Sequence, residues 1–168
     1  SQDSAGGGSS LKPVPVIIEN EIEISVSAEM LFNYVTQPWL WHEWHPSSTS
    51  AKSDHSVLAK GDAFDEVIEV QPLAPLPPRL KKHTAYVVTH SNPYQSWEVT
   101  GKMKGGWLRI RYAFEALPGK PESIRFHRRL EFAVSGPNRL FLPFLKRKMT
   151  RISPQALANL KQLMESTP

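Results

Sequence analysis

NRLFLPFLKRKMTRISPQALANLKQLMES, residues 138–166, is the stretch that decides the fold. Its apolar residues recur at steps of four and three, which places them along one face of an α-helix. A helix with one apolar face must bury that face against another element. The chain before it therefore has to supply a surface for this helix to cover. The apolar stripe consists of Leu145, Met149, Ile152, Ala156, Leu160 and Leu163.

A proline interrupts this helical pattern at Ser153-Pro154. Because proline lacks an amide hydrogen and clashes with the preceding turn, two arrangements are open. Either one helix kinks at Pro154, or a second helix begins there. In the second case Ser153 would be the N-cap and Pro154 would occupy the first helical position.

A basic run lies in the same stretch, beside the apolar residues 140–145. One interpretation is an amphipathic element that contacts an acidic membrane surface. The other is a helix whose cations face solvent while its apolar side packs on a sheet. We favour the second interpretation, because ordinary packed helices show this pattern. The run consists of Lys146, Arg147, Lys148 and Arg151.

Alternating apolar and polar residues predict strands over most of the upstream chain. Residues 16–27 set isoleucines on one face and glutamates on the other, the pattern of a half-buried strand. Ser27 is placed to cap a short helix that ends before Pro38. Further strands are expected over 47–57, as an edge strand, and over 63–70, 82–90, 94–102, 107–117 and 122–134.

Residues 71–78, QPLAPLPP, contain four prolines and cannot form regular structure. This connection between two strands either folds over the sheet as a flap or forms a stiff link at the surface.

The order of these elements predicts an α+β fold. Consecutive strands with short connections form an antiparallel meander. A twisted sheet of about seven strands then curves around the amphipathic C-terminal helix. Where sheet and helix diverge, an apolar cavity can open between them, and such a cavity is a physical route to a small-molecule site.

Residues 38–46, PWLWHEWHP, hold three of the five tryptophans and two of the six histidines. The flanking prolines limit any helix here to one or two turns. The zinc helix motif spaces its histidines four apart, whereas His42 and His45 are three apart, so metal ligation is disfavoured. Two interpretations remain. The tryptophans plug one end of the core, with the imidazoles bonded to backbone or water, or they line the mouth of a pocket.

A few polar residues share the core-facing side of the predicted strands. Arg128 does so in the last strand and Glu66 in residues 63–70, while His83 or Tyr86 does so in a strand of ambiguous register. A charged group in an apolar lining needs a partner. Arg128 can pair with Glu66, bind a carboxylate or phenolate of a ligand, or reach solvent through a register slip or bulge.

Three segments resemble the SRPBCC superfamily, the helix-grip fold of START lipid-transfer domains, plant pathogenesis-related allergens and polyketide cyclases. Residues 22–35, IEISVSAEMLFNYV, are similar to its opening strand and helix, and 39–46 to its tryptophan-and-proline segment. Residues 156–165, ALANLKQLME, look like its closing helix. The resemblance covers about residues 16–166 and is nearest to the polyketide cyclase/dehydrase-like branch. It implies a pocket for lipids, polyketides, hormones or other apolar compounds, and it supplies no catalytic set.

The topology of this superfamily would also pair the first strand with the last. Such exposed cross-strand pairs set register and solubility and contribute about a few tenths of a kcal/mol each. The acidic side chains Glu19, Glu21 and Glu23 would then lie opposite Arg125, His127 and Arg129.

Composition excludes several classes of protein. The 168 residues suffice for one domain with a core, and an apolar fraction of 40% is typical of globular rather than disordered chains. The net charge of +4 is scattered, which disfavours nucleic-acid binding. The absence of cysteine excludes disulfides and thiolate metal sites. No run approaches the roughly 20 apolar residues that span a bilayer.

The expected organisation is a flexible Gly/Ser-rich segment over 1–15 followed by one SRPBCC domain over 16–168. The expected location is the cytoplasm, although the sequence leaves open an upstream leader or anchor.

The most favoured function is the binding or carriage of a hydrophobic, lipid-like or aromatic molecule, with no cofactor, metal or nucleic acid. The alternative is a cyclase or dehydratase, whose candidate acids and bases are His83, Glu66, Tyr86 and Tyr112, with Arg128 holding an enolate. A third possibility is a docking module that uses the basic run. The predicted ligand-binding residues are Trp41, Trp44, Glu66, His83, Tyr86, Trp97, Tyr112, Phe126, Arg128 and Met149.

Overall fold

The computed structural model describes residues 14–166 and shows a seven-stranded antiparallel sheet with a long C-terminal helix. The prediction of a flexible N-terminal segment falls mostly on residues 1–13, outside the described residues. The elements in chain order are β1 Val16–Ile24, α1 Ala28–Val35, the 3-10 helix η1 Pro38–Glu43, β2 Ser48–Lys52, β3 Ala63–Val70, β4 Leu80–Asn92, β5 Ser96–Met103, β6 Gly106–Leu117, β7 Lys120–Val134, the 3-10 helix η2 Gly136–Phe141 and α2 Leu142–Glu165.

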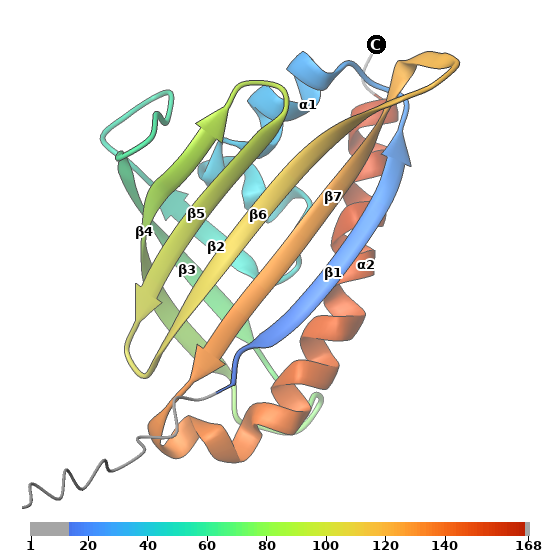
Figure 1. Cartoon of the computed structure of the whole chain (residues 1–168). Coiled ribbons are helices and arrows are strands. Elements are labelled where there is room, and N and C mark those ends of the chain that lie inside the picture. The colour runs from blue at the N-terminus through green and yellow to red at the C-terminus, as the bar shows by residue number, and fades with distance from the viewer. Residues whose placement is uncertain (1–13, 167–168) are drawn as a thin grey trace, which may run out of the picture.

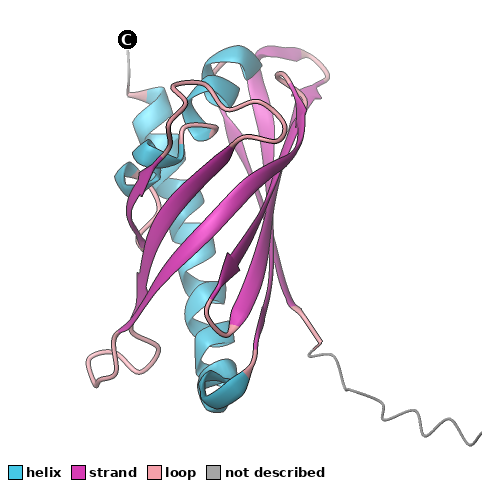
Figure 2. Cartoon of the chain, turned by 90° about the vertical axis from the view of Figure 1, so that its left-hand side faces the viewer, coloured by secondary structure: helices cyan, strands magenta, loops and turns pink. Residues whose placement is uncertain are grey.

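The sheet has the order β1-β7-β6-β5-β4-β3-β2 and curves around α2. Strands β2 to β7 form a meander, and β1 completes it by pairing with β7. Figure 1 shows α2 behind the sheet and beside β1, and Figure 2 shows the strands curling past it. The predicted helix-grip arrangement is therefore confirmed.

The pairing of β1 with β7 follows the predicted register. Glu19 lies opposite Arg129, Glu21 opposite His127 and Glu23 opposite Arg125. An oxygen of Glu19 lies 3.1 Å from Arg129 Nε, and an oxygen of Glu21 lies 3.1 Å from His127 Nδ1. Glu23 instead pairs with Lys120, at 3.0 Å from its Nζ. These contacts lie on the outer face and fix the alignment of the first and last strands.

The short helix α1 begins and ends as the sequence predicts. Ser27 is its N-cap, and the Ser27 Oγ accepts a hydrogen bond from the Met30 amide at 3.2 Å. Pro38 opens η1, which carries the tryptophan-rich segment across the inner side of the sheet toward β2. This short helix matters for the site because it places Trp41 against the core.

Helix α2 runs without a break through Pro154. Of the two arrangements that the sequence left open, a second helix capped by Ser153 is excluded, because Ser153 lies inside the helix and is fully buried. Figure 1 shows a curved α2, in line with the kinked-helix alternative. Its buried face includes Met149, Ala156 and Leu160, whereas Leu145, Ile152 and Leu163 are partly buried at its margins. Within residues 14–166, no helix is both long and apolar enough to cross a membrane.

The proline-rich residues 71–78 form a surface connection between β3 and β4 rather than a flap. Leu76 in this loop is exposed, and its carbonyl accepts a hydrogen bond of 3.0 Å from Gln71 Nε2. None of these residues lines the cavity described below.

Candidate functional site

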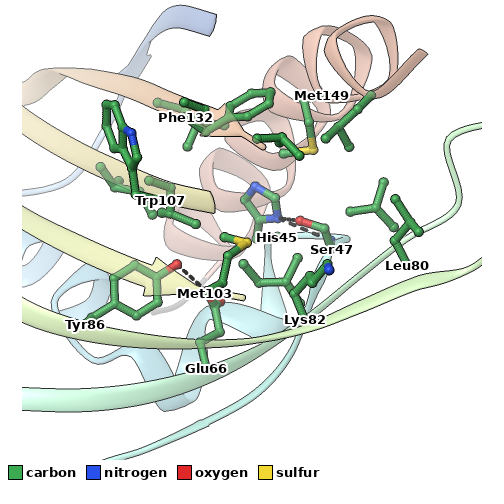
Figure 3. A pocket seen from close by; sticks show the side chains of 18 of the residues that line it. His45, Ser47, Glu66, Leu80, Lys82, Tyr86, Met103, Trp107, Phe132 and Met149 are labelled. Atoms are coloured by element: carbon green, nitrogen blue, oxygen red, sulfur yellow. Dashed lines mark hydrogen bonds between the residues drawn. The ribbon is translucent and has the colours of Figure 1, made fainter. Parts of the chain in front are cut away.

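A cavity of about 110 Å³ lies between the concave face of the sheet and α2. Sheet side chains from β3 to β7 form one wall, while Leu145 and Met149 of α2 form the other. Figure 3 shows Met103, Phe132 and Met149 around the cavity. The sheet contributes mainly apolar groups, including Ile68, Met103, Leu108, Ile110, Leu130 and Phe132.

The cavity has an open end and a buried polar group. The open end is marked by the exposed hairpin residues Lys104 and Gly105 and by Asn138 of η2. The buried polar group brings together side chains from four strands and from the segment after η1. Its members are His45, Glu66, Tyr86, Tyr112 and Arg128, each less than 10% exposed.

Glu66 is held by two hydroxyl groups. Ser48 Oγ donates to one carboxylate oxygen at 2.6 Å, and the Tyr86 hydroxyl donates to the other at 2.8 Å. Burial raises the pKa of Glu66, although these two hydrogen bonds and the nearby Arg128 charge act in the opposite direction. A carboxyl group in this setting is suited to hold a proton at a higher pH than a surface glutamate.

Arg128 points into the interior, as the alternation of β7 predicts. It lies opposite Tyr112 of β6 and Asn20 of β1, and it is 5% exposed, so the alternative of a register slip is excluded. Burial raises the pKa of Tyr112, although the nearby positive charge of Arg128 acts in the opposite direction. Arg128 Nε has no hydrogen-bond partner within the described chain.

One of the three alternatives for Arg128, a contact ion pair with Glu66, does not form in the described chain. Their charges influence each other, but among residues 14–166 no ion pair joins them. The carboxylate oxygens of Glu66 accept hydrogen bonds from the hydroxyl groups of Ser48 and Tyr86 instead. Arg128 therefore remains able to donate a hydrogen bond to a ligand.

His45 is the member of this group that sequence reasoning left out of the predicted site. The backbone amide of Ser47 donates to His45 Nδ1 at 3.2 Å, and Ser47 Oγ lies 2.9 Å from the same nitrogen. Burial and the positive charge of Arg128 lower the pKa of His45 well below its usual value. The only sequence signal was its place beside Trp44 in a segment that was expected to approach the core.

Two of the three tryptophans of this segment, Trp41 and Trp44, are buried and line the cavity. Trp41 Nε1 donates to the Val35 carbonyl at 2.8 Å, and its ring makes edge contacts with Phe64 and Trp97. Trp44 is held near α2 because Asn159 Nδ2 donates to its carbonyl at 3.1 Å. The plug and pocket interpretations therefore describe the same side chains.

Seven of the ten predicted ligand-binding residues line the cavity: Trp41, Trp44, Glu66, Tyr86, Tyr112, Arg128 and Met149. Three do not. His83 is exposed on the outer face of β4, because the even-numbered residues of that strand, such as Tyr86, point inward. Trp97 and Phe126 are fully buried, but they pack against Tyr112 within the core instead of facing the cavity.

The two histidines of the tryptophan-rich segment separate in the structure, with His42 exposed and His45 buried. In the part of the chain that the structure describes, no three histidine or carboxylate side chains gather as metal ligands.

Comparison with protein-family models gives a match over residues 15–165 to the family described as polyketide cyclase / dehydrase and lipid transport. A search of curated protein sequences finds no match.

Solved structures match the chain over most of its length. A START superfamily protein from Mycobacterium smegmatis aligns with a TM-score of 0.65 at 14% identity, covering 89% of this chain and 97% of that one. The Zhui aromatase/cyclase from a Streptomyces species gives 0.67 at 8% identity, with 90% and 94% covered. The di-domain aromatase/cyclase StfQ of the steffimycin pathway gives 0.63 at 14% identity, with 90% and 51% covered. At these identities the likeness establishes the fold.

Proposed function

Because the chain belongs to the polyketide cyclase/dehydrase and lipid transport family, we propose that it binds a hydrophobic small molecule between its sheet and α2. The observation that carries this proposal is the cavity itself, whose wall is mostly apolar on both the sheet and the helix side. Apolar concave sites with a few convergent polar groups are the usual form of small-molecule sites in proteins.

The cavity volume of about 110 Å³ suits a compound with a single ring. An apolar cavity of roughly 150 Å³ is known to hold benzene. Larger guests require side chains at the open end to move, and the thioethers of Met103 and Met149 are suited to this because methionine side chains are flexible. We therefore expect binding of aromatic or lipid-like compounds over a range of sizes.

Filling the cavity tests this function. Met149→Trp places a larger ring in the wall, whereas Met30→Trp makes the same change at a half-exposed position on α1. Native mass spectrometry of the purified proteins should detect a co-purified apolar compound with the wild type and Met30→Trp, and less of it with Met149→Trp. Titration with toluene, followed by amide NMR shifts, should give the same ranking.

If toluene does not shift the amide NMR signals of cavity residues in the wild type, the binding proposal is overturned. Equal binding by the two tryptophan variants would place the guest elsewhere on the protein.

A cyclase or dehydratase activity is the second candidate, favoured by the buried carboxyl group of Glu66. A carboxyl group with a raised pKa can act as a general acid, and Arg128 in the same cavity can stabilise an enolate oxygen. Turnover of a poly-keto substrate should fall about 100-fold or more in Glu66→Gln and in Arg128→Met. His83→Ala is the matched control, since His83 lies on the outer face. Absence of turnover in the wild type leaves binding alone as the function.

A further inference from the structure

We propose that the Nε2–H group of His45 is a hydrogen-bond donor for an oxygen atom of the ligand, so that the cavity selects guests with a carbonyl or similar acceptor. This inference rests on the proposed binding function and specifies the chemical class of the guest. Figure 3 shows His45 in the cavity wall, with one ring nitrogen bonded to Ser47 and the other directed toward the cavity.

The contacts of His45 determine which ring nitrogen carries the proton. A backbone amide can only donate, so the Ser47 amide, 3.2 Å from Nδ1, requires Nδ1 to be an acceptor. In a neutral imidazole the proton then resides on Nε2. The Ser47 hydroxyl, 2.9 Å from Nδ1, is able to donate to the same lone pair and supports this tautomer.

The ring is also held in its neutral form. A second proton would have to go on Nδ1, where the Ser47 amide already points its hydrogen. The nearby positive charge of Arg128 and the burial of the ring oppose protonation as well. His45 therefore presents a single neutral donor to the cavity.

This donor is not used within the protein. His45 is 7% exposed, and its Nε2 has no hydrogen-bond partner in the described chain. A buried N–H group without an acceptor is costly, and such groups are few in folded proteins. An acceptor atom on a bound guest would remove that cost.

The neighbouring polar groups favour an acceptor on the guest as well. Arg128 and Trp44 also line the cavity, and the Nε atom of Arg128 and the Nε1 atom of Trp44 are buried donors without a partner in the described residues. The one carboxylate of the cavity, Glu66, already accepts from Ser48 and Tyr86. Among the described residues that line the cavity, the buried side-chain atoms without a partner are therefore all N–H donors. Such donors match ketones, quinones, phenolates or carboxylates better than hydrocarbons or amines.

The tautomer can be measured directly by long-range ¹H–¹⁵N NMR of the histidine rings. We expect His45 to show the Nε2–H form with Nδ1 unprotonated at pH 7. A His45 ring that is protonated on Nδ1 would overturn the proposal before any ligand is added.

Ligand selectivity can be measured with two compounds of nearly equal shape, acetophenone and α-methylstyrene, which differ in a carbonyl oxygen against a methylene group. The ratio of their Kd values, from amide NMR titrations, should favour acetophenone about five-fold more in the wild type than in His45→Phe, as for one net hydrogen bond. His42→Phe removes an exposed imidazole from the same segment and should keep the wild-type ratio. His45→Gln, which restores an N–H donor, should recover part of it.

The possible outcomes separate the two proposals. If neither compound binds the wild type, the cavity function itself fails. If both bind and His45→Phe leaves the ratio unchanged, the binding function stands and the His45 subsite is wrong. If His45→Phe does not fold, which thermal unfolding would reveal, His45→Gln and the ring NMR still decide the question.

Discussion

At the scale of single residues, the site combines groups whose proton affinities are shifted in opposite directions. Burial raises the pKa of Glu66 and lowers the pKa of His45, so both side chains are pushed toward their neutral forms. The positive charge of Arg128 limits the rise in the pKa of Glu66 and adds to the fall in the pKa of His45. The cavity therefore keeps charge low on two of its titratable groups without excluding polar atoms.

The first prediction concerns the pH dependence of stability through Glu66. The folded state binds the Glu66 proton more tightly than the unfolded chain does. As pH rises above about 4.5, the unfolded chain therefore releases this proton first, and the folded state becomes less stable relative to it. The free energy of unfolding of the wild type, relative to Glu66→Gln, should thus decrease as pH rises from 4.5 toward neutrality. Urea unfolding at several pH values measures the difference.

Glutamine suits this comparison because Ser48 and Tyr86 hydroxyls can both donate and accept, so an amide retains their contacts. Glu122→Gln, on an exposed position of β7, is the control and should give no such trend. A difference between the wild type and Glu66→Gln that grows with pH would show that the carboxylate is stabilised by its surroundings instead.

At the scale of elements, strand β5 shapes the cavity by omitting a side chain. Gly101 lies on the inner face beside Tyr86, and a Cβ atom there would come within 2.6 Å of Thr84 Cγ2 and 2.7 Å of Tyr86 Cε1. The missing Cβ lets the Tyr86 ring lie across β5 while its hydroxyl reaches Glu66.

The second prediction follows from this contact. Gly101→Ala should lower the free energy of unfolding by roughly 1–3 kcal/mol, because the buried Tyr86 ring has to shift. Thr100→Ala, at the neighbouring position on the outer face, should cost less. Chemical denaturation compares the two variants, and equal losses would mean that the Tyr86 ring adapts freely.

The third prediction concerns helix α2. Ser153 is fully buried, and its Oγ has no hydrogen-bond partner within residues 14–166, so Ser153→Ala should stabilise the protein by roughly 0.5–1.5 kcal/mol. Thr150→Ala, one turn earlier, removes an exposed hydroxyl that donates to the Lys146 carbonyl at 2.7 Å. This variant should be stabilised less than Ser153→Ala. A loss of stability in Ser153→Ala, seen as a lower Tm, would mean that this hydroxyl has a partner in solution.

At the scale of the whole molecule, α2 and the concave sheet share one core. Leu160 of α2 is fully buried, as are Trp97 of β5 and Phe126 of β7. Since neither layer can bury its apolar face alone, we expect the sheet and the helix to unfold together.

The fourth prediction tests this shared core. Leu160→Ala should lower the free energy of unfolding by about 2–5 kcal/mol, the usual cost of a core leucine, whereas Gln162→Ala on the exposed side should change it little. Far-UV circular dichroism and tryptophan fluorescence should shift to the same new midpoint. Midpoints that separate in the variant would show that sheet and helix unfold independently.

Sequence alone predicted most of the strands and helices and placed Arg128 in the inward register of its strand, while the pairing of β1 with β7 followed from the resemblance to the superfamily. The elements and the inward register are local properties, because alternation along a strand and periodicity along a helix are carried by the residues themselves. The strand 82–90 was ambiguous because both of its faces hold apolar and polar residues. Val87 is 43% exposed, while Lys82 faces the cavity, and this mixture explains the wrong prediction for His83.

Only the tertiary structure decided which inward residues meet the cavity and which fill the core. The rings of Tyr112 and Phe126 are in contact, and both residues point inward from their strands, yet only Tyr112 lines the cavity. The free donor of His45 likewise depends on where the turn after η1 places Ser47. The curvature of the sheet and the path of α2 set the gap between the layers, and both arise from contacts far apart in the chain that no local pattern encodes.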